Sequence, residues 1–443
     1  MPFDILENLK KVLPPSSKPY HFTNLQSTPR ESSPPIHKPK AQTPTKSIKV
    51  EHLFTLFHEQ IPILALEVIV YITIPHDNSK IEKLIYIAKA DSTGLTPQLK
   101  IKIRDVIHVF MQWLYLYPVK SYFSDIKVKK IVDYTSCITK AHDPFVSRAQ
   151  RALHILTERA KGDSEYGMPI VTNVSDSKEN VVPQELIDDS SKHVTRLVMF
   201  TRAEPEYLFP NSKKNKHKHI SSDSQLLKWW LKTVSTTVVN TFETVSQRKL
   251  NILNSETAQI KRFFPDDMWE VGDIYSNEDS IHSPAVYCIP LLPDDPKGRF
   301  LEHLVVENRI KKVKLRQFWT ELSIRQEFRL GIIVGLIGVE GVAKTDFSDK
   351  FKSTVVMLNK TKFNSIKQMM LEIDYQETAL ETEKLYGDLL NELEEVEEDK
   401  LFHELVVKYS VRPVRVIGSN SNGSTVNTIN VLGVRSKKKQ RLV

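Results

Sequence analysis

The sequence feature that most constrains the fold is a run of apolar and β-branched residues, IPILALEVIVYITI, from Ile61 to Ile74. The run is 14 residues long, and Glu67 is its only charged residue. Continuous apolar runs of this kind are typical of a β-strand that is covered on both faces. A membrane-spanning helix needs ~20 apolar residues, so the run is too short for one. We therefore expect a large buried sheet in which LIYIAKA, Leu84 to Ala90, is the neighbouring strand.

The rest of the pattern mixes helices with strands. Apolar residues recur at helical spacing between Asp105 and Tyr115, whereas VTRLVMFTR, Val194 to Arg202, has the composition of a strand. Further helices are expected at 224–251, from Asp294-Asp295-Pro296 to about 325, and at 362–405, and further strands at 285–292 and 328–339. Because strands and helices do not alternate regularly, the sequence predicts a single large α/β domain with a central mixed sheet flanked by helices.

Composition sets the limits of this domain. The chain has 443 residues, of which 40% are hydrophobic, and this is enough to bury a sizeable core. Two stretches have too few apolar residues to contribute to a core and are expected to be mobile. They are the Pro/Ser/Lys-rich loop 29–46 and the Asp/Ser-rich insertion 161–192. We expect residues 1–28 to pack on the core, 47–410 to form the domain, and 411–443 to be a tail with the basic end RSKKKQR.

Charge and cysteine content narrow the classes of function. The chain carries 62 Lys and Arg against 54 Asp and Glu, which suits an acidic partner such as nucleic acid, a phosphorylated ligand or an acidic protein. Two cysteines, Cys137 and Cys288, exclude a disulfide scaffold and a thiolate zinc site. The first residues lack the pattern of a signal peptide, so an intracellular location is expected. Seven acidic residues from Asp388 to Asp399 are interpreted as a solvated helix face.

Two motifs that resemble a phosphate-binding loop and a metal site are set aside, and so is a nucleophilic hydrolase. Gly338 to Thr345, GVEGVAKT, nearly matches a phosphate-binding loop, but Ala343 stands where that loop needs glycine. His217 and His219 lie among lysines that would repel a metal cation, and no third ligand is close in sequence. No G-x-S-x-G is present, and Cys288 is expected in the core rather than as a nucleophile.

The segment from Phe200 to Trp230 combines a strand end, aromatic residues and a basic loop before a helix. The loop NSKKNKHKH, Asn211 to His219, holds four lysines and two histidines, and Ser221 or Ser222 can cap the helix that follows. Positive charge in front of a helix N-terminus suits phosphate groups. The alternative is a solvated basic loop followed by two core tryptophans, and nucleic acid is a competing ligand.

A second segment, AVYCIPLLPDDPKGRF, places two acids in front of a helix. Asp295 and Pro296 fit the N-cap and the first position of that helix. Capping does not require the other acid, Asp294. Adjacent carboxylates can raise one another's pKa, which suits removal of a proton from an ammonium group. A third acid, Asp91, ends the strand LIYIAKAD at a sheet edge, where sites of α/β proteins gather.

At these segments the chain resembles the fungal histone acetyltransferases of the regulator-of-Ty-transposition family. The matching stretches are long, follow the same order and extend from about residue 48 to residue 330. They include LFHEQ from Leu56, KAD from Lys89, YLFPNSKKNKHKHI from Tyr207, KWW from Lys228, WEVGDI from Trp269, AVYCIPLLPDDPKGRF from Ala285 and FWTELSIRQEF from Phe318. The proline-rich loop, the Asp/Ser insertion and the C-terminal third match poorly.

The resemblance implies a histone acetyltransferase domain over 47–410, with a fold similar to that of CREB-binding-protein-type acetyltransferases. It implies acetyl-CoA as cosubstrate, no metal, and lysines of histone H3, with its partner histone, as substrate. It also implies work in the nucleus with histone chaperones of the nucleosome-assembly-protein and anti-silencing-function types, in chromatin assembly, transcription regulation and DNA-damage tolerance. Direct nucleic-acid binding is secondary at most, and no membrane partner is expected.

Site residues are carried over from the family one position at a time. Positions that bind acetyl-CoA are matched by Ala90, Lys100, Ile101, Lys102, Ile103, Arg104, Phe200, Arg202, Glu204, His219, Ile220, Ser221 and Trp229. Positions important for catalysis are matched by Asp91, Tyr207, Trp230, Asp294 and Asp295, and Lys297 matches a lysine that acetylates itself. Glu204 and Lys102 depart from the family, which has a small residue and a serine there.

The expected reaction is direct transfer without a covalent enzyme intermediate. The substrate lysine must lose a proton before its nitrogen attacks the thioester carbonyl. We expect Asp295 to be the base and Asp91 and Asp294 to attract or orient the ammonium, and the sequence leaves open which of the three acids takes the proton. A hypothesis from another class is a basic chromatin or nucleic-acid-binding protein without catalysis, which would have no use for paired acids beside its basic surface.

Overall fold

The structure is a computed structural model that describes residues 3–32, 34–36, 45–75, 80–123, 184–276, 281–325, 328, 332–344, 350–377 and 381–408. These residues belong to one compact unit spanning 1–408. The expected tail 411–443, Cys137 and residues 161–183 of the expected insertion lie outside the described residues.

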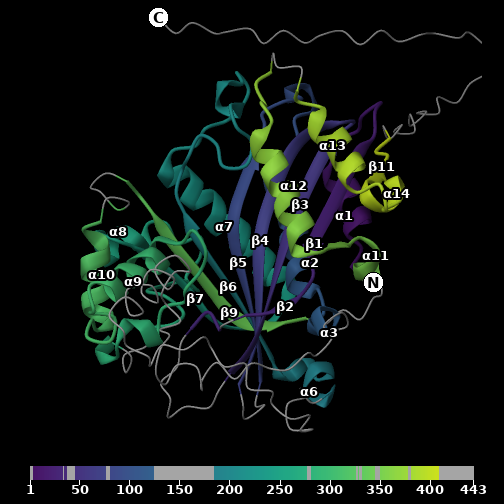
Figure 1. The fold of residues 1–443 in the computed structure, drawn as a ribbon. Coiled ribbons are helices and arrows are strands. Elements are labelled where there is room, and N and C mark those ends of the chain that lie inside the picture. The colour runs from purple at the N-terminus through teal and green to yellow at the C-terminus, as the bar shows by residue number, and fades with distance from the viewer. Residues whose placement is uncertain are drawn as a thin grey trace, which may run out of the picture. The chain divides into compact units, whose positions relative to one another are not determined.

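One mixed sheet organises the described residues (Figure 1), as the sequence predicts. Its strands run in the order β10-β1-β3-β4-β5-β6-β9-β7-β8, with β11 beside β1 and β2 beside β3. The strands β3, β4 and β5 are successively antiparallel, whereas β5 and β6 are parallel. The strands are β1 (Tyr20–Ser27), β2 (Arg30–Glu31), β3 (Thr45–His58), β4 (Ile61–Pro75), β5 (Ile81–Ser92), β6 (His193–Thr201), β7 (Phe242–Ile252), β8 (Glu270–Val271), β9 (Gly335–Ala343), β10 (Val356–Leu358) and β11 (His403–Leu405).

Helices cover both faces of this sheet (Figure 1). One face shares a core with α1, α2 and α7, to which Leu9, Phe110 and Leu231 contribute. The other face packs on α12 and α13 through residues such as Phe363 and Leu389. These helices are α1 (Ile5–Val12), α2 (Ile103–Leu116), α7 (Asp223–Thr241), α12 (Lys360–Glu372) and α13 (Lys384–Glu392).

The central strand β4 contains the apolar run from Ile61 to Ile74, and the prediction of a strand buried on both faces is confirmed. Val68 belongs to the core on the α2 side and Ala65 to the core on the α12 side. The one charged residue of the run, Glu67, is buried and forms an ion pair with Lys367 of α12.

A smaller helical region forms its own core beside the sheet. The helices α9 (Pro296–Val306) and α10 (Leu315–Ser323) bury Phe300, Leu304 and Phe318 together, and Figure 1 shows them grouped with α8 (Thr257–Lys261). The remaining described α-helices are short: α3 (Val119–Phe123), α6 (Gln184–Asp188), α11 (Lys350–Ser353) and α14 (Glu398–Leu401). None of the described helices combines the length and apolarity needed to span a membrane.

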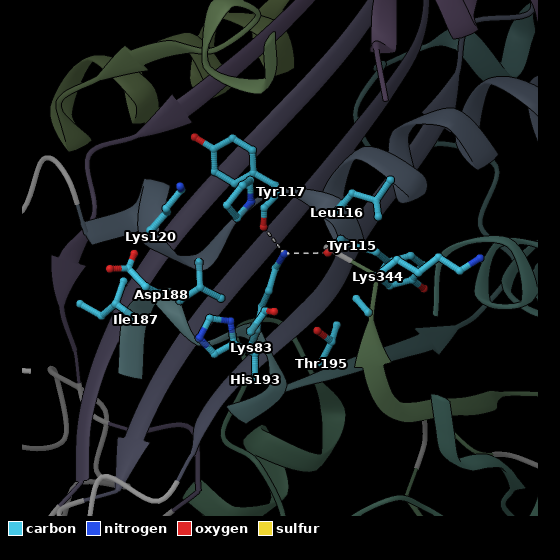
Figure 2. Close-up of a pocket in the computed structure, with 14 residues that line it drawn as sticks. Lys83, Tyr115, Leu116, Tyr117, Lys120, Ile187, Asp188, His193, Thr195 and Lys344 are labelled. Carbon is cyan, nitrogen blue, oxygen red and sulfur yellow. Dashed lines mark hydrogen bonds between the residues drawn. The ribbon is translucent and has the colours of Figure 1, made fainter. Parts of the chain in front are cut away.

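A buried lysine fixes the direction of α2 against the sheet (Figure 2). Lys83 of β5 donates from Nζ to the carbonyls of Tyr115 (3.2 Å) and Tyr117 (2.7 Å), as Figure 2 shows. It also donates to the carbonyl of Leu114 (2.6 Å), so all three acceptors lie at the C-terminus of α2. Burial lowers the pKa of Lys83 to about 7, while these carbonyls, at the negative end of the helix, favour its charged form. Because the C-terminus of α2 is held near the start of β5, its N-terminus lies toward the end of β5.

Two expected elements in the middle of the chain are wrong in part. The helix expected over 224–251 ends at Thr241, and the strand β7 follows, paired with β9. The stretch TFETVSQRKL carries β-branched residues between polar ones, which suits a strand. The strand expected over 285–292 is instead a 3₁₀ turn (Ala285–Tyr287) followed by chain that joins no sheet, because most of its apolar side chains are buried against α9 and α10.

The C-terminal elements also differ from the expectation. The helix expected to reach 325 is split into α9 and α10, and Asn308 between them has a left-handed backbone (φ 54°), which ends a helix. The strand expected over 328–339 is β9, which begins at Gly335. Residues 362–405 form α12, α13 and α14 but end in the strand β11. The acids at 394, 395 and 397–399 are exposed, as a solvated face requires.

The expected segments at the N-terminus and the insertion contain regular structure. Residues 1–28 supply α1 and also β1, a strand within the main sheet. The loop expected to be mobile over 29–46 contains β2, which pairs with Lys49 and Ile48, and the start of β3. The expected insertion 161–192 ends in the helix α6, where Leu186 and Ile187 are buried in the core. Local composition did not show these long-range contacts.

Candidate active site

Two parallel strands and two helices end together at one edge of the sheet. Since β5 and β6 are parallel neighbours, their carboxyl ends lie at the same edge. The helices α2 and α7 run in the same direction, because Arg104 lies 5.9 Å from the Trp229 ring near their N-termini and His108 bonds Thr237 (2.9 Å) further along. Strand carboxyl ends and helix N-termini at one edge form the usual phosphate-binding place of α/β proteins.

The N-terminus of α2 is open, whereas that of α7 is closed. Ser222 and Gln225 form a reciprocal capping box at α7, so of the two candidates for this cap Ser222 is the one used. At α2 the N-cap is Lys102, and no side chain caps the helix. Lys100, two residues before this N-cap, has a left-handed backbone (φ 50°), a conformation that costs free energy for a non-glycine residue. The N–H of Asp105 donates to the carbonyl of Lys102 (2.9 Å), so the N–H groups available to an anion are those of Ile103 and Arg104.

Most residues expected to bind acetyl-CoA lie on the elements that meet at this edge. Lys100, Lys102 and His219 are exposed, and Ile220 is 50% exposed although its side chain is large and apolar. The set comes from the end of β5 (Ala90), the start of α2 (Lys100, Ile101, Lys102, Ile103 and Arg104), the end of β6 with the turn after it (Phe200, Arg202 and Glu204), and the start of α7 (His219, Ile220, Ser221 and Trp229).

Three members of this set, Arg202, Glu204 and Phe200, are already in contact with protein groups. Arg202 forms an ion pair with Glu204 at 2.8 Å, so Glu204 neutralises a cation beside the edge. Phe200 packs edge-on against Phe328, with ring centroids 6.0 Å apart, and belongs to the α9–α10 core.

The aromatic residues expected at the site differ in exposure. Trp229 is half-buried, whereas Trp230 is 5% exposed and packs in the core, with the two rings perpendicular at 4.9 Å. Tyr207 donates from its hydroxyl to the carbonyl of Arg202 (2.8 Å), and burial raises its pKa, so the phenol stays protonated. Of the two tryptophans, only Trp229 can offer a surface to a ligand, and the buried ring of Trp230 packs against it.

Both carboxylate oxygens of Asp91 already have partners within the protein. Its carboxylate oxygen Oδ2 accepts from the backbone N–H groups of Tyr207 (2.7 Å), Leu208 (2.9 Å) and Phe209 (3.2 Å). The other oxygen, Oδ1, accepts from the N–H of Ser92 and forms an ion pair with Lys218 (2.7 Å). A carboxylate with this many partners has little capacity left for a substrate ammonium, and its contacts indicate that it anchors the basic loop.

Asp294 and Asp295 have opposite environments. Asp295 is 1% exposed and caps α9 by accepting from the backbone N–H of Lys297 (2.9 Å), so the expected cap is confirmed. Its Oδ2 lies 2.6 Å from Lys297 Nζ in an ion pair, yet no hydrogen bond of good geometry reaches that oxygen from the described residues. The side chain of Asp294 is 76% exposed, its backbone is left-handed (φ 57°), and its carboxylate lies 3.4 Å from Lys89.

The two acids lie against β5, close to the strand end that carries Asp91. Lys89, the partner of Asp294, is two residues before Asp91 on β5. Burial raises the pKa of Tyr86 on the same strand, and the charges of Asp295 and Asp294 raise it further, so that tyrosine is near both carboxylates and stays protonated. The structure thus brings the three expected acids to one stretch of β5, while giving them different contacts.

Cys288 is buried in the α9–α10 core, as expected. Burial raises the pKa of its thiol, and the charge of Asp273 raises it further, which disfavours the nucleophilic thiolate. Cys288 is therefore a core residue.

The near match to a phosphate-binding loop lies in a strand, and the histidine pair belongs to no metal-holding group among the described residues. Gly338 to Ala343 lie in the paired strand β9 and not in a loop, and a Cβ on Gly341 would lie 2.2 Å from the carbonyl oxygen of Thr244. His217 and His219 are exposed in the basic loop. Across the described ranges, no group of three or more His, Cys, Asp or Glu side chains is arranged to hold a metal ion.

Comparisons with known proteins place this geometry in a family. Residues 5–389 match the model of the histone acetyltransferase KAT11-type domain. A histone acetyltransferase RTT109 from Candida albicans is 31% identical over 376 residues, covering 83% of this chain and 94% of the relative. This chain belongs to the KAT11-type histone acetyltransferase family. It is an enzyme of that class, of the Rtt109 type.

Further relatives agree with this assignment. A histone acetyltransferase rtt109 from Schizosaccharomyces pombe is 31% identical over 173 residues, which cover 34% of this chain and 45% of the relative. The crystal structure of Rtt109 from Aspergillus fumigatus superposes with a TM-score of 0.60 at 18% identity, covering 91% of this chain and 98% of the other. The predicted α/β fold, a large mixed sheet flanked by helices, is therefore confirmed, and a non-catalytic chromatin-binding protein is not what the family indicates.

The family implies acetyl-CoA as cosubstrate, and the edge described above fits its phosphates. The helix α2 is uncapped, and the buried Nε of Arg104 has no hydrogen-bond partner among the described residues. An unpaired buried donor beside an open helix N-terminus suits an anionic ligand.

Sequence reasoning missed two residues at this site. In the sequence, Lys218 is one of several cations in the basic loop, and Lys89 is one residue of the motif KAD. Neither residue type nor spacing distinguishes a buried lysine in a basic run from its exposed neighbours.

Proposed function

We propose that this enzyme transfers the acetyl group of acetyl-CoA to lysines of histone H3, presented with its partner histone, by direct attack of the deprotonated lysine. The observation that supports this most is the state of Asp295. One of its carboxylate oxygens caps α9, while the other faces Lys297 Nζ at 2.6 Å and accepts no hydrogen bond of good geometry from the described residues. A buried carboxylate with one oxygen held by the cap and the other facing a lysine ammonium can keep its position, exchange that ammonium for the substrate's and accept a proton.

In this proposal the phosphates of acetyl-CoA bind at the open N-terminus of α2, where Lys100, Lys102 and Arg104 supply positive charge. The half-buried Trp229 and the exposed Ile220 line the path of the pantetheine arm. The basic loop before α7 adds counter-charge through its exposed lysines, Lys213, Lys214 and Lys216. The remaining positions of the expected set, such as Ala90 and Ser221, shape the strand and helix ends around the ligand.

The proposed reaction needs one proton acceptor from the protein and a second acid that attracts the substrate. Asp295 takes the proton from the substrate ammonium, and Asp294, which is exposed, attracts the lysine to the site. The free amine attacks the thioester carbonyl, so that a C–N bond forms, the C–S bond breaks, and the thiol of coenzyme A leaves with a proton. Asp91 and Trp230 act indirectly, because their contacts are with the protein.

Lys297 is proposed to be a site of self-acetylation. Its side chain is 12% exposed and its Nζ lies 2.6 Å from Asp295 Oδ2, beside the proposed base. Acetylation would remove the positive charge that now faces this carboxylate, and would free Asp295 for the substrate.

The proposed setting is the nucleus, with chaperones of the nucleosome-assembly-protein and anti-silencing-function types presenting the histones. This part rests on the resemblance to the fungal family and on the basic end of the chain, RSKKKQR. Histones are basic, so an acidic chaperone would keep them from binding nonspecifically to acids exposed on this enzyme.

The test is mass spectrometry of a histone H3–H4 complex, free and bound to each chaperone type, after incubation with this protein and isotope-labelled acetyl-CoA. Labelled acetyl-lysine on H3 supports the proposal, and a different pattern with each chaperone supports their role. Binding of acetyl-CoA without any label on the histones would refute the substrate assignment. Absence of acetyl-CoA binding in a thermal-shift titration would refute the whole proposal.

A further inference from the structure

Lys218 differs from every other described cation of the basic loop. Its side chain is only 5% exposed, whereas Lys213, Lys214 and Lys216 are exposed. Its Nζ donates to Asp91 Oδ1 at 2.7 Å and to Ser212 Oγ at 2.7 Å. The charge of Lys218 is therefore used inside the protein and is not presented to a ligand.

Asp91 joins this lysine to the rest of the segment after β6. The same carboxylate accepts from three consecutive backbone N–H groups, at 207–209, and from Ser92 of its own strand. Ser212 in turn donates to the carbonyl of Phe209. We call Asp91, Ser212 and Lys218 the Asp91–Lys218 clamp. It holds both ends of the loop 207–218 to the end of β5.

The backbone of the loop is fitted closely to the same place. Gly94 has a left-handed backbone (φ 72°), and a Cβ there would lie 2.5 Å from Cα of Lys218. Asn215 donates from Nδ2 to the carbonyl of Thr93 at 2.7 Å. The chain after β5 and the basic loop therefore touch with no room for a side chain, and a small displacement of Lys218 would be transmitted to its neighbours.

The residues that immediately follow Lys218 are His219, Ile220 and Ser221, which belong to the proposed acetyl-CoA site. We propose that Lys218 is a positioning residue, whose buried ion pair with Asp91 fixes these three residues at the edge where acetyl-CoA binds. The inference rests on the proposed function, because it assigns no contact between Lys218 and the ligand. With this role for the ion pair, Asp91 would affect activity through Lys218, without contact with the substrate lysine.

The test compares two clamp variants with a matched control. Lys218→Met removes the charge and keeps much of the apolar stem, and Ser212→Ala removes one acceptor of Lys218 with a smaller effect on folding. The control, Lys360→Met, breaks another ion pair to a buried acid, Glu51 of β3. Glu51 is two strands from Asp91 and four residues further along, roughly 16 Å away.

Initial rates are measured with varied acetyl-CoA at low salt and at about 0.5 M salt, together with the melting temperature of each variant. We expect Lys218→Met to raise the KM for acetyl-CoA roughly 10-fold or more, since misplaced binding groups are costly. Ser212→Ala should raise it less. The increase should persist at high salt, because a buried pair is screened little. Lys360→Met should lower the melting temperature and leave KM near the wild-type value.

The outcomes separate this inference from the proposed function. A wild-type enzyme that does not use acetyl-CoA refutes the proposed function before any variant is compared. If the wild type is active and both clamp variants keep its KM, with losses only in the folded fraction, Lys218 is merely structural and the inference is wrong. A KM increase that disappears at high salt would also overturn it, because Lys218 would then act as an ordinary phosphate-attracting charge.

Discussion

Replacing Asp295 with Asn separates capping from proton transfer at one position. Asn caps helices about as well as Asp, so its side-chain oxygen can still accept from the backbone N–H of Lys297, which now lies 2.9 Å from Asp295 Oδ1. The proton acceptor is lost, and we expect kcat to fall roughly 10²-fold or more, which corresponds to about 2.7 kcal/mol of barrier.

The structure adds a cost that capping alone does not include. Asp295 Oδ2 is paired with Lys297 Nζ at 2.6 Å, and removal of one partner of a buried pair destabilises a protein by about 3–5 kcal/mol when the remaining charge stays buried. The side chain of Lys297 is 12% exposed, so part of this cost is relieved when its ammonium turns to solvent. We therefore expect a lower melting temperature for Asp295→Asn, but a folded protein at 25 °C.

The assay measures kcat and KM for acetyl-CoA by mass spectrometry of a histone substrate, with Lys297→Met as the matched control. Lys297→Met breaks the same ion pair from the other side and keeps the carboxylate. If Asp295 is the base, Asp295→Asn should lose at least 10 times more kcat than Lys297→Met, with little change in KM. Equal losses in both variants, or a fully active Asp295→Asn, would refute the reasoning and return Asp295 to a purely structural role.

Three further predictions concern the basic loop, the tail and the buried lysine of β5. Changing the exposed loop cations Lys213, Lys214 and Lys216 to Ala should raise the KM for acetyl-CoA at low salt and much less at high salt, and an unchanged KM at low salt would contradict a role in phosphate attraction. Deleting residues 435–443 should leave kcat for a free histone peptide intact, and a large fall would place the tail in the active site. Burial lowers the pKa of Lys83 to about 7, whereas its pKa in the unfolded chain is about 10.4. Between these pH values the unfolded chain keeps a proton that the folded protein has lost, so the free energy of unfolding rises with pH. Denaturant unfolding at pH 7 and pH 9 should show a gain of up to roughly 2–3 kcal/mol in the wild type that Lys83→Met lacks, and equal pH dependence in the two proteins would contradict it.

Strong local patterns predicted the centre of the fold. The run from Ile61 to Ile74 lies in β4, because a strand buried on both faces is apolar at nearly every position. The helical spacing between Asp105 and Tyr115 lies in α2, because burial of one helix face repeats with the period of the helix. The element after α7 was misjudged for the opposite reason. Phe242 to Ile252 becomes a strand through its pairing with β9, about 90 residues later, and a local pattern carries no record of that partner.

The candidate site shows the same division. The cap at Asp295 could be predicted because Asp-Pro before a helix is a local signal, and the structure bears it out. The environments of the three acids could not. Asp91 and Asp294 are both acids near the end of β5, yet one accepts hydrogen bonds from loop N–H groups and the other is open to solvent. That difference is set by the chain after β6 and by the segment before α9, which reach β5 only in the folded protein.

The most direct test of the account is a crystal structure with a bisubstrate analogue in which a lysine side chain is joined to coenzyme A. In that structure the pyrophosphate should accept hydrogen bonds from backbone N–H groups at the N-terminus of α2, and the lysine nitrogen should lie beside Oδ2 of Asp295. An analogue bound elsewhere, or one whose lysine nitrogen contacts Asp91 while Asp295 stays paired with Lys297, would contradict it.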